Sequence, residues 1–294
     1  MSILDNFDKY QYWRDEKLAN AVNSIEQCLL EIANPSVLST AEKDKIQYLC
    51  RTNNFALFEI KAQDDYAQAI VQINRQVGLI DYDQHLYAQN DGLAYVTQSN
   101  KQEQRSEFIP YTNKAIGWHT DGYYNAQNNQ VRAFSLFCVS PSATGGVNQW
   151  IDPQMVYLLL REDNIDVVKA LSHPQAMSIP EHKMDGQVRR TKSTGAIFFI
   201  DEPSVELYMR YTQRKKNIEF LDSLEVKQAV TLLDDLLKTT TPHHFEYTMN
   251  ANQGLICNNV LHNRSAFVDD PEHPRLLLRG RYSNRVCCYN SKHD

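Results

Sequence analysis

The chain has 294 residues, of which 42% are hydrophobic and 22% charged, the balance of an ordinary globular protein with one or two domains. Its 30 basic and 36 acidic side chains give a net charge of −6, which argues against nucleic acid as a general partner because an acidic protein gains little from counterion release. No run approaches the ~18 apolar residues of a membrane span and no secretory signal is visible, so we expect no membrane partner and a cytoplasmic location.

Cysteine usage agrees with that compartment. Six cysteines occur without a CxxC framework, and a chain of this length does not need disulfides to be stable, so we expect free thiols. Two short basic stretches, at residues 189–192 and 214–216, are expected to be solvated loops or part of a helix face.

The first 50 residues have helical periodicity. Apolar residues recur at three- and four-residue spacing from Trp13 to Ile32, which predicts one amphipathic helix that Asn34-Pro35 ends. Thr40 can begin a second, shorter helix. The compact apolar run at 55–60 predicts a strand, and helical spacing returns over 64–78. We therefore expect residues 1–50 to form a helical extension that packs on a core.

Beyond residue 93 the sequence is dominated by short strand-like runs rich in aromatic and branched residues. These runs lie at 92–98, 115–124, 132–139, 196–201, 254–262 and 275–282. A further helix is predicted at 222–238. No internal repeat and no Ser/Gly/Pro linker interrupts the chain, so we expect a mainly β protein with flanking helices, of α+β class, in a single domain over residues 1–294.

One aromatic stretch carries the first candidate ligands. GWHTDGYY places His119 and Asp121 two residues apart, and on a strand such side chains point to the same face. A neutral imidazole and a carboxylate are two of the three ligands of the 2-His-1-carboxylate site in non-haem Fe(II) oxygenases. The third should be a histidine on a distant strand, and among nine histidines our candidate is His262, at the end of the run 254–262. A lone histidine is more often a packed or surface residue, so the context of His262 has to decide.

That context includes Arg275, which opens the run RLLLRGRY. A guanidinium binds a carboxylate bidentately and keeps its charge, so Arg275 is suited to hold the distal carboxylate of an oxo-acid. The alternative is that the arginines of this run make ion pairs on a sheet face.

Taken together, these motifs resemble the Fe(II)/2-oxoglutarate dioxygenases of the taurine dioxygenase and γ-butyrobetaine hydroxylase type, over residues 55 to 285. IPYTNKAIGWHTDGYY resembles the γ-butyrobetaine hydroxylase segment around the iron ligands, and LHNRSAF resembles that family's HGR element. The pair Arg275 and Arg279 resembles that of taurine dioxygenase, whose first arginine grips 2-oxoglutarate and whose second grips the substrate's anion. TGGVNQW resembles the Gly-Gly turn that carries a small polar residue to the co-substrate, and Asn148 stands at that place.

The resemblance implies a cupin-like double-stranded β-helix, or jelly roll, over residues 55–290 with helical insertions. It implies Fe(II) on His119, Asp121 and His262, with 2-oxoglutarate and O2 as co-substrates and with Arg275 and Asn148 binding 2-oxoglutarate. The implied reaction is hydroxylation of an unactivated C–H bond, with release of succinate and CO2.

The implied substrate is a small molecule, and three side chains are candidates to bind it: Arg279, Tyr111 and Tyr124. The positive charge of Arg279 favours a carboxylate, sulfonate or other anion over a betaine. The cysteine-rich zinc module of γ-butyrobetaine hydroxylase is absent from this sequence, and its aromatic cage is only partly traceable.

Two other functions fit part of the pattern. A Zn(II) metallohydrolase could use the same three ligands, although it leaves Arg275 unexplained. A non-catalytic jelly-roll protein that binds a metal or a ligand is the second alternative. The sequence does not name the substrate, and it leaves the oligomeric state open, a homo-oligomer included.

Overall fold

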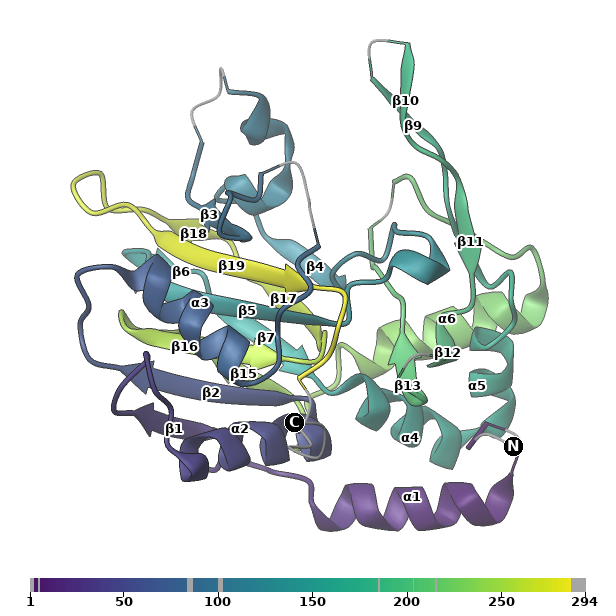
Figure 1. The fold of residues 1–294 in the computed structure, drawn as a ribbon. Helices are drawn as coiled ribbons and strands as arrows, with labels where there is room; N and C mark the ends of the chain where they lie inside the picture. Colours follow the sequence, from purple (N-terminus) through teal and green to yellow (C-terminus); the bar gives the residue numbers. More distant parts are fainter. Residues whose placement is uncertain are drawn as a thin grey trace. The chain divides into compact units, whose positions relative to one another are not determined.

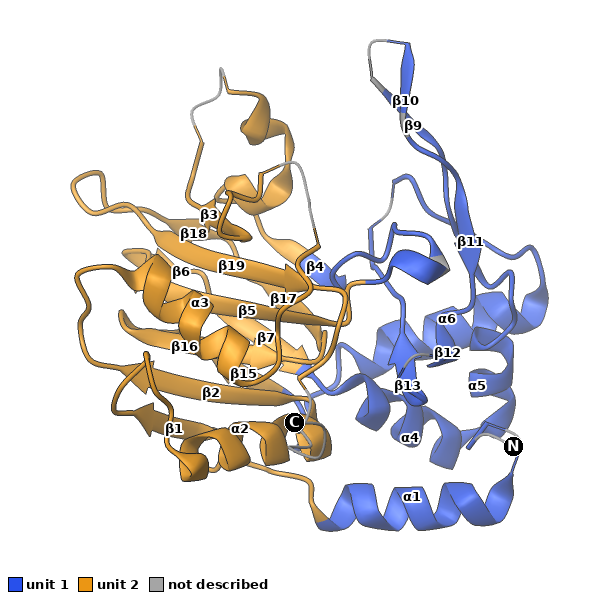
Figure 2. Ribbon diagram, viewed as in Figure 1, with its two compact units in different colours: residues 1–19, 117–130, 151–244 blue, residues 20–116, 131–150, 245–294 orange. Residues whose placement is uncertain are grey.

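The structure is a computed structural model that describes residues 3–4, 6–83, 87–99, 103–184, 186–202, 204–214 and 216–286 (Figure 1). It mixes helices with several sheets and divides into two compact units (Figure 2). Unit 1 comprises residues 1–19, 117–130 and 151–244, and unit 2 comprises residues 20–116, 131–150 and 245–294. None of the helices in the described ranges combines the length and the apolar character that a membrane crossing requires.

Unit 2 is built around a six-stranded sheet with the strand order β1-β2-β16-β5-β19-β3. Its strands are β1 (Leu29–Ile32), β2 (Phe55–Ile60), β16 (Gln253–Cys257), β5 (Ala133–Ser140), β19 (Leu276–Tyr282) and β3 (Leu93–Val96). β1 and β2 run parallel, and every other neighbouring pair in this sheet is antiparallel. The strand predicted at 55–60 is confirmed residue for residue.

The two faces of this sheet bury two separate hydrophobic clusters. Along β2, Phe58 and Ile60 face a cluster that contains residues of helices α2 (Thr40–Asn53) and α3 (Tyr66–Gln76). Phe55 and Leu57 of the same strand face the other cluster, which contains Trp150 and Phe245. This alternation is the period of two that a strand imposes on its side chains. Both helices begin at side-chain caps, at Ser39 for α2 and at Asp65 for α3.

Smaller elements complete unit 2. A second sheet places β7 between β15 and β17, and β18 pairs with β6. The bounds are β15 (Phe245–Tyr247), β7 (Asn148–Ile151), β17 (Leu261–Arg264), β6 (Thr144–Gly145), β18 (Phe267–Val268), and the 3-10 helices η1 (Gln104–Glu107) and η2 (Ile109–Tyr111). Four cysteines, Cys28, Cys50, Cys138 and Cys257, are buried free thiols, and Cys287 and Cys288 lie outside the described residues.

Unit 1 combines helices with short antiparallel sheets. The helices are α1 (Phe7–Ala19), α4 (Pro153–Asp163), α5 (Ile165–Leu171), α6 (Leu224–Leu236) and the 3-10 helix η3 (Gln127–Asn129). The strands are β8 (Met177–Ile179), β9 (His182–Met184), β10 (Gln187–Arg190), β11 (Ser193–Gly195), β12 (Phe198–Asp201), β13 (Glu206–Met209) and β14 (Glu219–Phe220). Strand β4 (Ile116–His119) begins at the last residue of unit 2 before the chain enters unit 1. The helix predicted at 222–238 is confirmed as α6.

Two predicted elements differ from the structure. The single helix expected from Trp13 to Ile32 ends at Ala19, and Leu29–Ile32 is strand β1, whose backbone pairs with β2. Residues 1–50 are therefore not wholly helical. A short apolar run does not distinguish strand from helix by periodicity, and here the neighbouring strand decides.

The predicted strand 254–262 is two strands. β16 ends at Cys257 and β17 begins at Leu261, in a different sheet. Between them, Asn259 has a φ of 52°, in the left-handed region, and its side chain donates to Val131 O (2.6 Å). The Asn258 side chain donates to Cys50 O (3.0 Å). At this turn the two side chains bond to backbone carbonyls of other segments, and the chain leaves the first sheet. His262 therefore lies on β17, in the second sheet.

Candidate metal and co-substrate site

His119 and Asp121 lie together in unit 1. His119 ends β4, and Asp121 follows in a turn with 5% of its surface exposed. His119 Nε2 and Asp121 Oδ1 are 3.7 Å apart. Gly122, with φ of 68°, then turns the chain in a conformation that few other residues adopt readily. The two predicted ligands are thus brought together, although Asp121 stands beyond the end of the strand.

Backbone pairing with residues 211–213 fixes this segment. The Thr120 N–H donates to Tyr211 O (3.0 Å), and the Tyr211 N–H donates to the Thr120 hydroxyl (3.1 Å). The Gln213 N–H donates to Trp118 O (2.8 Å). The backbone on both sides of His119 is therefore hydrogen-bonded to residues 211–213, by the Trp118 carbonyl before it and the Thr120 N–H after it, and this sets the direction of its side chain.

His262 lies in unit 2, half-buried on β17, with its ring 4.8 Å from that of Phe134. Its Nδ1 donates to Val260 O (2.9 Å), the carbonyl two residues earlier. His119 has the same arrangement, with Nδ1 donating to Gly117 O (2.9 Å). A carbonyl can only accept, so in both rings the proton is on Nδ1 and the lone pair is on Nε2. A hydrogen bond from Nδ1 to a carbonyl is the usual way in which a metal-binding histidine is oriented.

Arg275 is 4% exposed and lies at the start of β19 in unit 2. Its backbone N–H donates to Asp269 Oδ1 (2.8 Å), and its guanidinium lies 5.0 Å from the Phe267 ring centre. Among the described residues, no hydrogen bond or ion pair joins its guanidinium to another group. Burial lowers the pKa of this guanidinium. The charge of Asp269 acts on this pKa more weakly, in the opposite direction. A buried cation with no ion pair or hydrogen bond to its guanidinium is suited to an anionic ligand.

The Gly-Gly turn lies beside that arginine. A Cβ on Gly146 would stand 2.8 Å from Ser142 Oγ and 3.7 Å from Arg275 Nε, so the turn packs directly against that arginine. A Cβ on Gly145 would stand 2.3 Å from Ala266 O, and φ is 73° at this residue, so glycine is required. Asn148 begins β7 and its side-chain amide donates to Gly146 O (3.3 Å).

Arg264 is also buried but serves the fold. Its guanidinium donates to three backbone carbonyls, at Pro110 (3.3 Å), Thr112 (2.8 Å) and Lys114 (2.6 Å). Burial, with a smaller effect from Arg275, lowers its pKa to about 9. Sequence reasoning did not assign this anchoring role, because the three carbonyls belong to a segment 150 residues away or more.

Two of the predicted substrate residues are neighbours in unit 2. Arg279, on β19, lies close enough to Tyr111 for its charge to lower the pKa of the phenol, against the larger opposite effect of burial. Tyr111 is 2% exposed, and its hydroxyl has no hydrogen-bond partner among the described residues. Tyr87 packs on it edge to face at 5.1 Å, and Arg105 lies 5.9 Å from its ring centre. Cationic and phenolic groups therefore gather on this part of unit 2.

Tyr124, the third, lies in unit 1 three residues after Asp121. The Arg190 guanidinium lies 5.4 Å from its ring centre. Arg190 was expected to be solvated, and instead it is half-buried. The signal that the sequence analysis missed is the aromatic pair Tyr123-Tyr124, because the face of a tyrosine ring can pack against an arginine guanidinium.

The comparisons with known proteins agree with these motifs. Residues 14–281 match the taurine catabolism dioxygenase TauD, TfdA family. A uridine-5′-phosphate dioxygenase from Streptomyces sp is 26% identical over 182 residues. That match covers 59% of this chain and 64% of the relative, so the chain spans less than two thirds of the relative's length.

Solved structures share the fold at low sequence identity. An asparagine oxygenase, in complex with Fe(II), 3-hydroxyasparagine and succinate, has a TM-score of 0.62 at 13% identity, with 83% of this chain and 80% of that chain covered. The non-haem iron oxygenase OrfP, in complex with Fe and α-ketoglutaric acid, has a TM-score of 0.62 at 12% identity, with the same coverage. This chain belongs to the TauD, TfdA family, whose members are dioxygenases that depend on Fe(II) and 2-oxoglutarate.

Proposed function

We propose that this protein is an Fe(II)- and 2-oxoglutarate-dependent oxygenase that hydroxylates an unactivated C–H bond of a small, anion-bearing metabolite. Family membership supports the reaction class. The observation that carries the proposal is Arg275, a buried guanidinium that makes no ion pair among the described residues. A Zn(II) hydrolase has no use for such a group, whereas a keto diacid requires one.

Two imidazoles and one carboxylate are the donor set that non-haem Fe(II) oxygenases use, so His119, Asp121 and His262 fit the metal. The carbonyls of Gly117 and Val260 would hold the two rings with Nε2 as the ligating atom. When bound, Fe(II) and 2-oxoglutarate together activate O2 for C–H hydroxylation, with 2-oxoglutarate converted to succinate and CO2.

Arg275 would bind the distal carboxylate of 2-oxoglutarate. Its planar fork offers two parallel N–H donors, which match a carboxylate in geometry as well as in charge. Its burial and the Phe267 ring on its face keep water away, which strengthens the pairing. Asn148, held by Gly146 O next to this arginine, would add an amide donor to the same ligand.

Arg279 and Tyr111 would recognise the substrate in unit 2. Arg279 supplies a positive charge close to the buried phenol of Tyr111, and Tyr111 supplies a hydroxyl with no hydrogen-bond partner among the described residues. A polar group of the substrate would accept from the Tyr111 hydroxyl beside the charge of Arg279. Tyr124 would contribute from unit 1. The protein's part in the reaction is then to position substrate and co-substrate and to keep the site dry.

The finer architecture belongs to the same proposal. The sheets of unit 2, within residues 55–290, would form the double-stranded β-helix of this family, with both units acting as one catalytic domain over residues 1–294. The buried free thiols of unit 2 are compatible with a cytoplasmic enzyme.

The test is an anaerobic titration of the metal-free protein with Fe(II) and then 2-oxoglutarate, followed by the visible charge-transfer band. We expect the band, and succinate release that rises when a substrate is present. The first compounds to screen are uridine 5′-phosphate, asparagine and taurine, which occur in the names of the similar proteins and of the family. Tight Zn(II) binding without a 2-oxoglutarate complex would favour the hydrolase, and binding of neither Fe(II) nor 2-oxoglutarate would favour the non-catalytic protein.

A further inference from the structure

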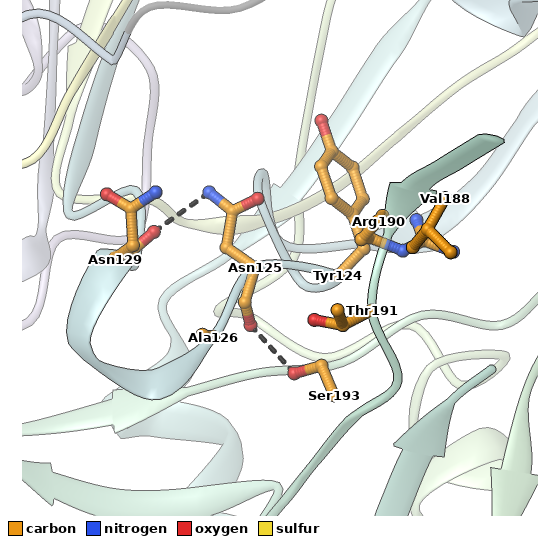
Figure 3. A pocket seen from close by; sticks show the side chains of 8 residues that line it. All are labelled: Tyr124, Asn125, Ala126, Asn129, Val188, Arg190, Thr191 and Ser193. Atoms are coloured by element: carbon orange, nitrogen blue, oxygen red, sulfur yellow. Dashed lines mark hydrogen bonds between the residues drawn. The ribbon is translucent and has the colours of Figure 1, made fainter. Parts of the chain in front are cut away.

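Unit 1 contains a pocket of about 370 Å³ in the chain segment that follows Asp121 (Figure 3). One wall comes from residues 124–129 and the other from residues 188–193, at the end of β10 and the start of β11. The lining residues that matter here are Tyr124, Asn125, Asn129, Arg190, Thr191 and Ser193. None of the described residues that line the pocket is acidic.

The two walls are tied together. The Ser193 hydroxyl donates to Asn125 O (2.9 Å), and the Asn125 side chain donates to Asn129 O (2.8 Å), as Figure 3 shows. Beneath them, buried Arg210 donates to Tyr123 O (2.7 Å) and to Ser193 O (3.0 Å). The pocket is therefore formed before any ligand arrives, which lowers the entropic cost of binding.

Arg190 supplies the charge in this pocket. The face of its guanidinium covers Tyr124, and one edge donates to Pro180 O (3.1 Å). Its Nε is buried and has no hydrogen-bond partner among the described residues. Contact with a ring face does not satisfy an N–H in the guanidinium plane. One charged donor of Arg190, its Nε, is thus without a protein acceptor among the described residues.

A second cation lies near. The charge of Arg214 lowers the pKa of Arg190, after the larger effect of burial, and the Arg214 guanidinium donates to the Tyr123 hydroxyl (3.1 Å). Thr191 is exposed on the pocket wall, and its hydroxyl can add a donor. Two positive charges, hydroxyl and amide donors and no lining carboxylate favour an anion.

The pocket is also close to the candidate metal ligands within unit 1. The rings of His119 and Tyr123 are 6.4 Å apart, and those of Tyr123 and Tyr124 are 5.2 Å apart. An unbroken line of three rings thus leads from the metal-ligand candidate His119 to the pocket wall. The pocket wall at Tyr124 is therefore two ring contacts from His119.

We propose that this pocket binds an oxyanion group of the organic substrate, a phosphate, sulfonate or carboxylate, and that Arg190 is the cation that recognises it. In calling the ligand a substrate, this inference rests on the proposed function. The binding of the oxyanion itself does not require Fe(II) or 2-oxoglutarate.

The test uses the full-length protein without Fe(II) or 2-oxoglutarate. It is titrated by ligand-observed NMR with phenyl phosphate, benzenesulfonate and benzoate, which separate the three anion types, and with phenol as the neutral probe. We expect at least one anion to bind and phenol not to bind. Arg190→Gln should weaken the binding by about tenfold or more, because a charge-assisted hydrogen bond is lost.

Arg51→Gln is the matched control, since Arg51 also stacks on a tyrosine, Tyr48, at 5.8 Å but is exposed in unit 2. Its affinity for the anions should equal that of the wild type. Equal affinity in Arg190→Gln would overturn the proposal, as would failure of all three anions to bind. If anion binding is lost in Arg279→Gln and kept in Arg190→Gln, the site belongs to unit 2 and the proposal is wrong.

Circular dichroism checks that each variant is folded. Should Arg190→Gln fail to fold, Arg190→Lys keeps a charge but lacks the planar fork, and it should bind the anions more weakly than the wild type; unchanged affinity contradicts the assignment. The charge-transfer titration of the wild type tests the proposed function separately. If the wild type shows no charge-transfer band but binds the anions, the proposed oxygenase function is refuted and the proposed anion site stands.

Discussion

Replacing Arg275 by glutamine should sharply weaken 2-oxoglutarate binding while the protein stays folded. The side chain belongs to a residue that is only 4% exposed, so solvent screens little of its attraction for a carboxylate. Removing one partner of a buried, hydrogen-bonded charge pair costs about 2–5 kcal/mol. Since about 1.4 kcal/mol is a tenfold change, the dissociation constant should rise by roughly 30-fold to several thousandfold.

The assay is the anaerobic titration of the Fe(II)-loaded protein with 2-oxoglutarate, read from the charge-transfer band. Arg51→Gln again serves as the control, because it removes an exposed arginine of the same unit. A dissociation constant in Arg275→Gln within about threefold of the wild type would refute the reasoning, since it corresponds to less than one charge-assisted bond. The anchor would then be Arg279, because the Arg264 guanidinium already holds three carbonyls.

The stability of the metal-free protein gives a second readout from the same residue. Arg275→Met removes a buried charge that has no ion pair among the described residues, so the free energy of unfolding should stay equal or rise. Arg264→Met leaves three carbonyls without their donor and should lower it by about 3 kcal/mol. Urea denaturation of both variants compares the two, and a larger loss at Arg275 would mean that this side chain stabilises the fold.

Three further predictions follow from the described contacts. His119→Ala and His262→Ala should each lose the Fe(II)/2-oxoglutarate band, and a band that survives in either variant removes that histidine from the ligand set. Gly145→Ala should destabilise the protein by about 2 kcal/mol or more in urea denaturation, because its Cβ would meet Ala266 O at 2.3 Å with φ at 73°. Burial lowers the pKa of His244 below 6.5, so the unfolded chain binds more protons there and the free energy of unfolding falls as the pH drops below 6.5. His244→Gln should reduce that slope, and an unchanged slope would assign it to other groups, His243 among them.

Sequence periodicity predicted the elements whose structure depends on residues close in the chain. The alternating burial of β2 and the periodicity of α6 follow from residues a few positions apart, and both elements were placed correctly from the sequence. Where contact with a distant segment determines the local structure, the prediction from the sequence was wrong. Leu29–Ile32 is a strand because β2 lies beside it, and Lys17 is buried in α1 because Asp152 pairs with it. Neither partner can be read from the helix-like spacing of residues 13–32.

The candidate site shows the same division. The spacing of His119 and Asp121 was sufficient to predict that they lie together, because side chains two residues apart on an extended segment point to the same side. The run that ends at His262 was interpreted as one strand, although Asn258 and Asn259 break it by bonding to Cys50 O and Val131 O. These partners lie more than 100 residues away, so no local pattern contains them.

The arginines of this chain show why residue type alone does not identify a binding site. Arg210 and Arg264 are as buried as Arg275, yet the donors of the first two are committed to backbone carbonyls. A guanidinium in that role supplies hydrogen bonds to backbone carbonyls, and its charge is not needed to bind a ligand. When a buried guanidinium holds no protein acceptor, the desolvation cost of its charge is not offset in the free protein, and a ligand that brings an anion recovers it. By this criterion Arg275, and the Nε edge of Arg190, are the positions where binding should be sought first.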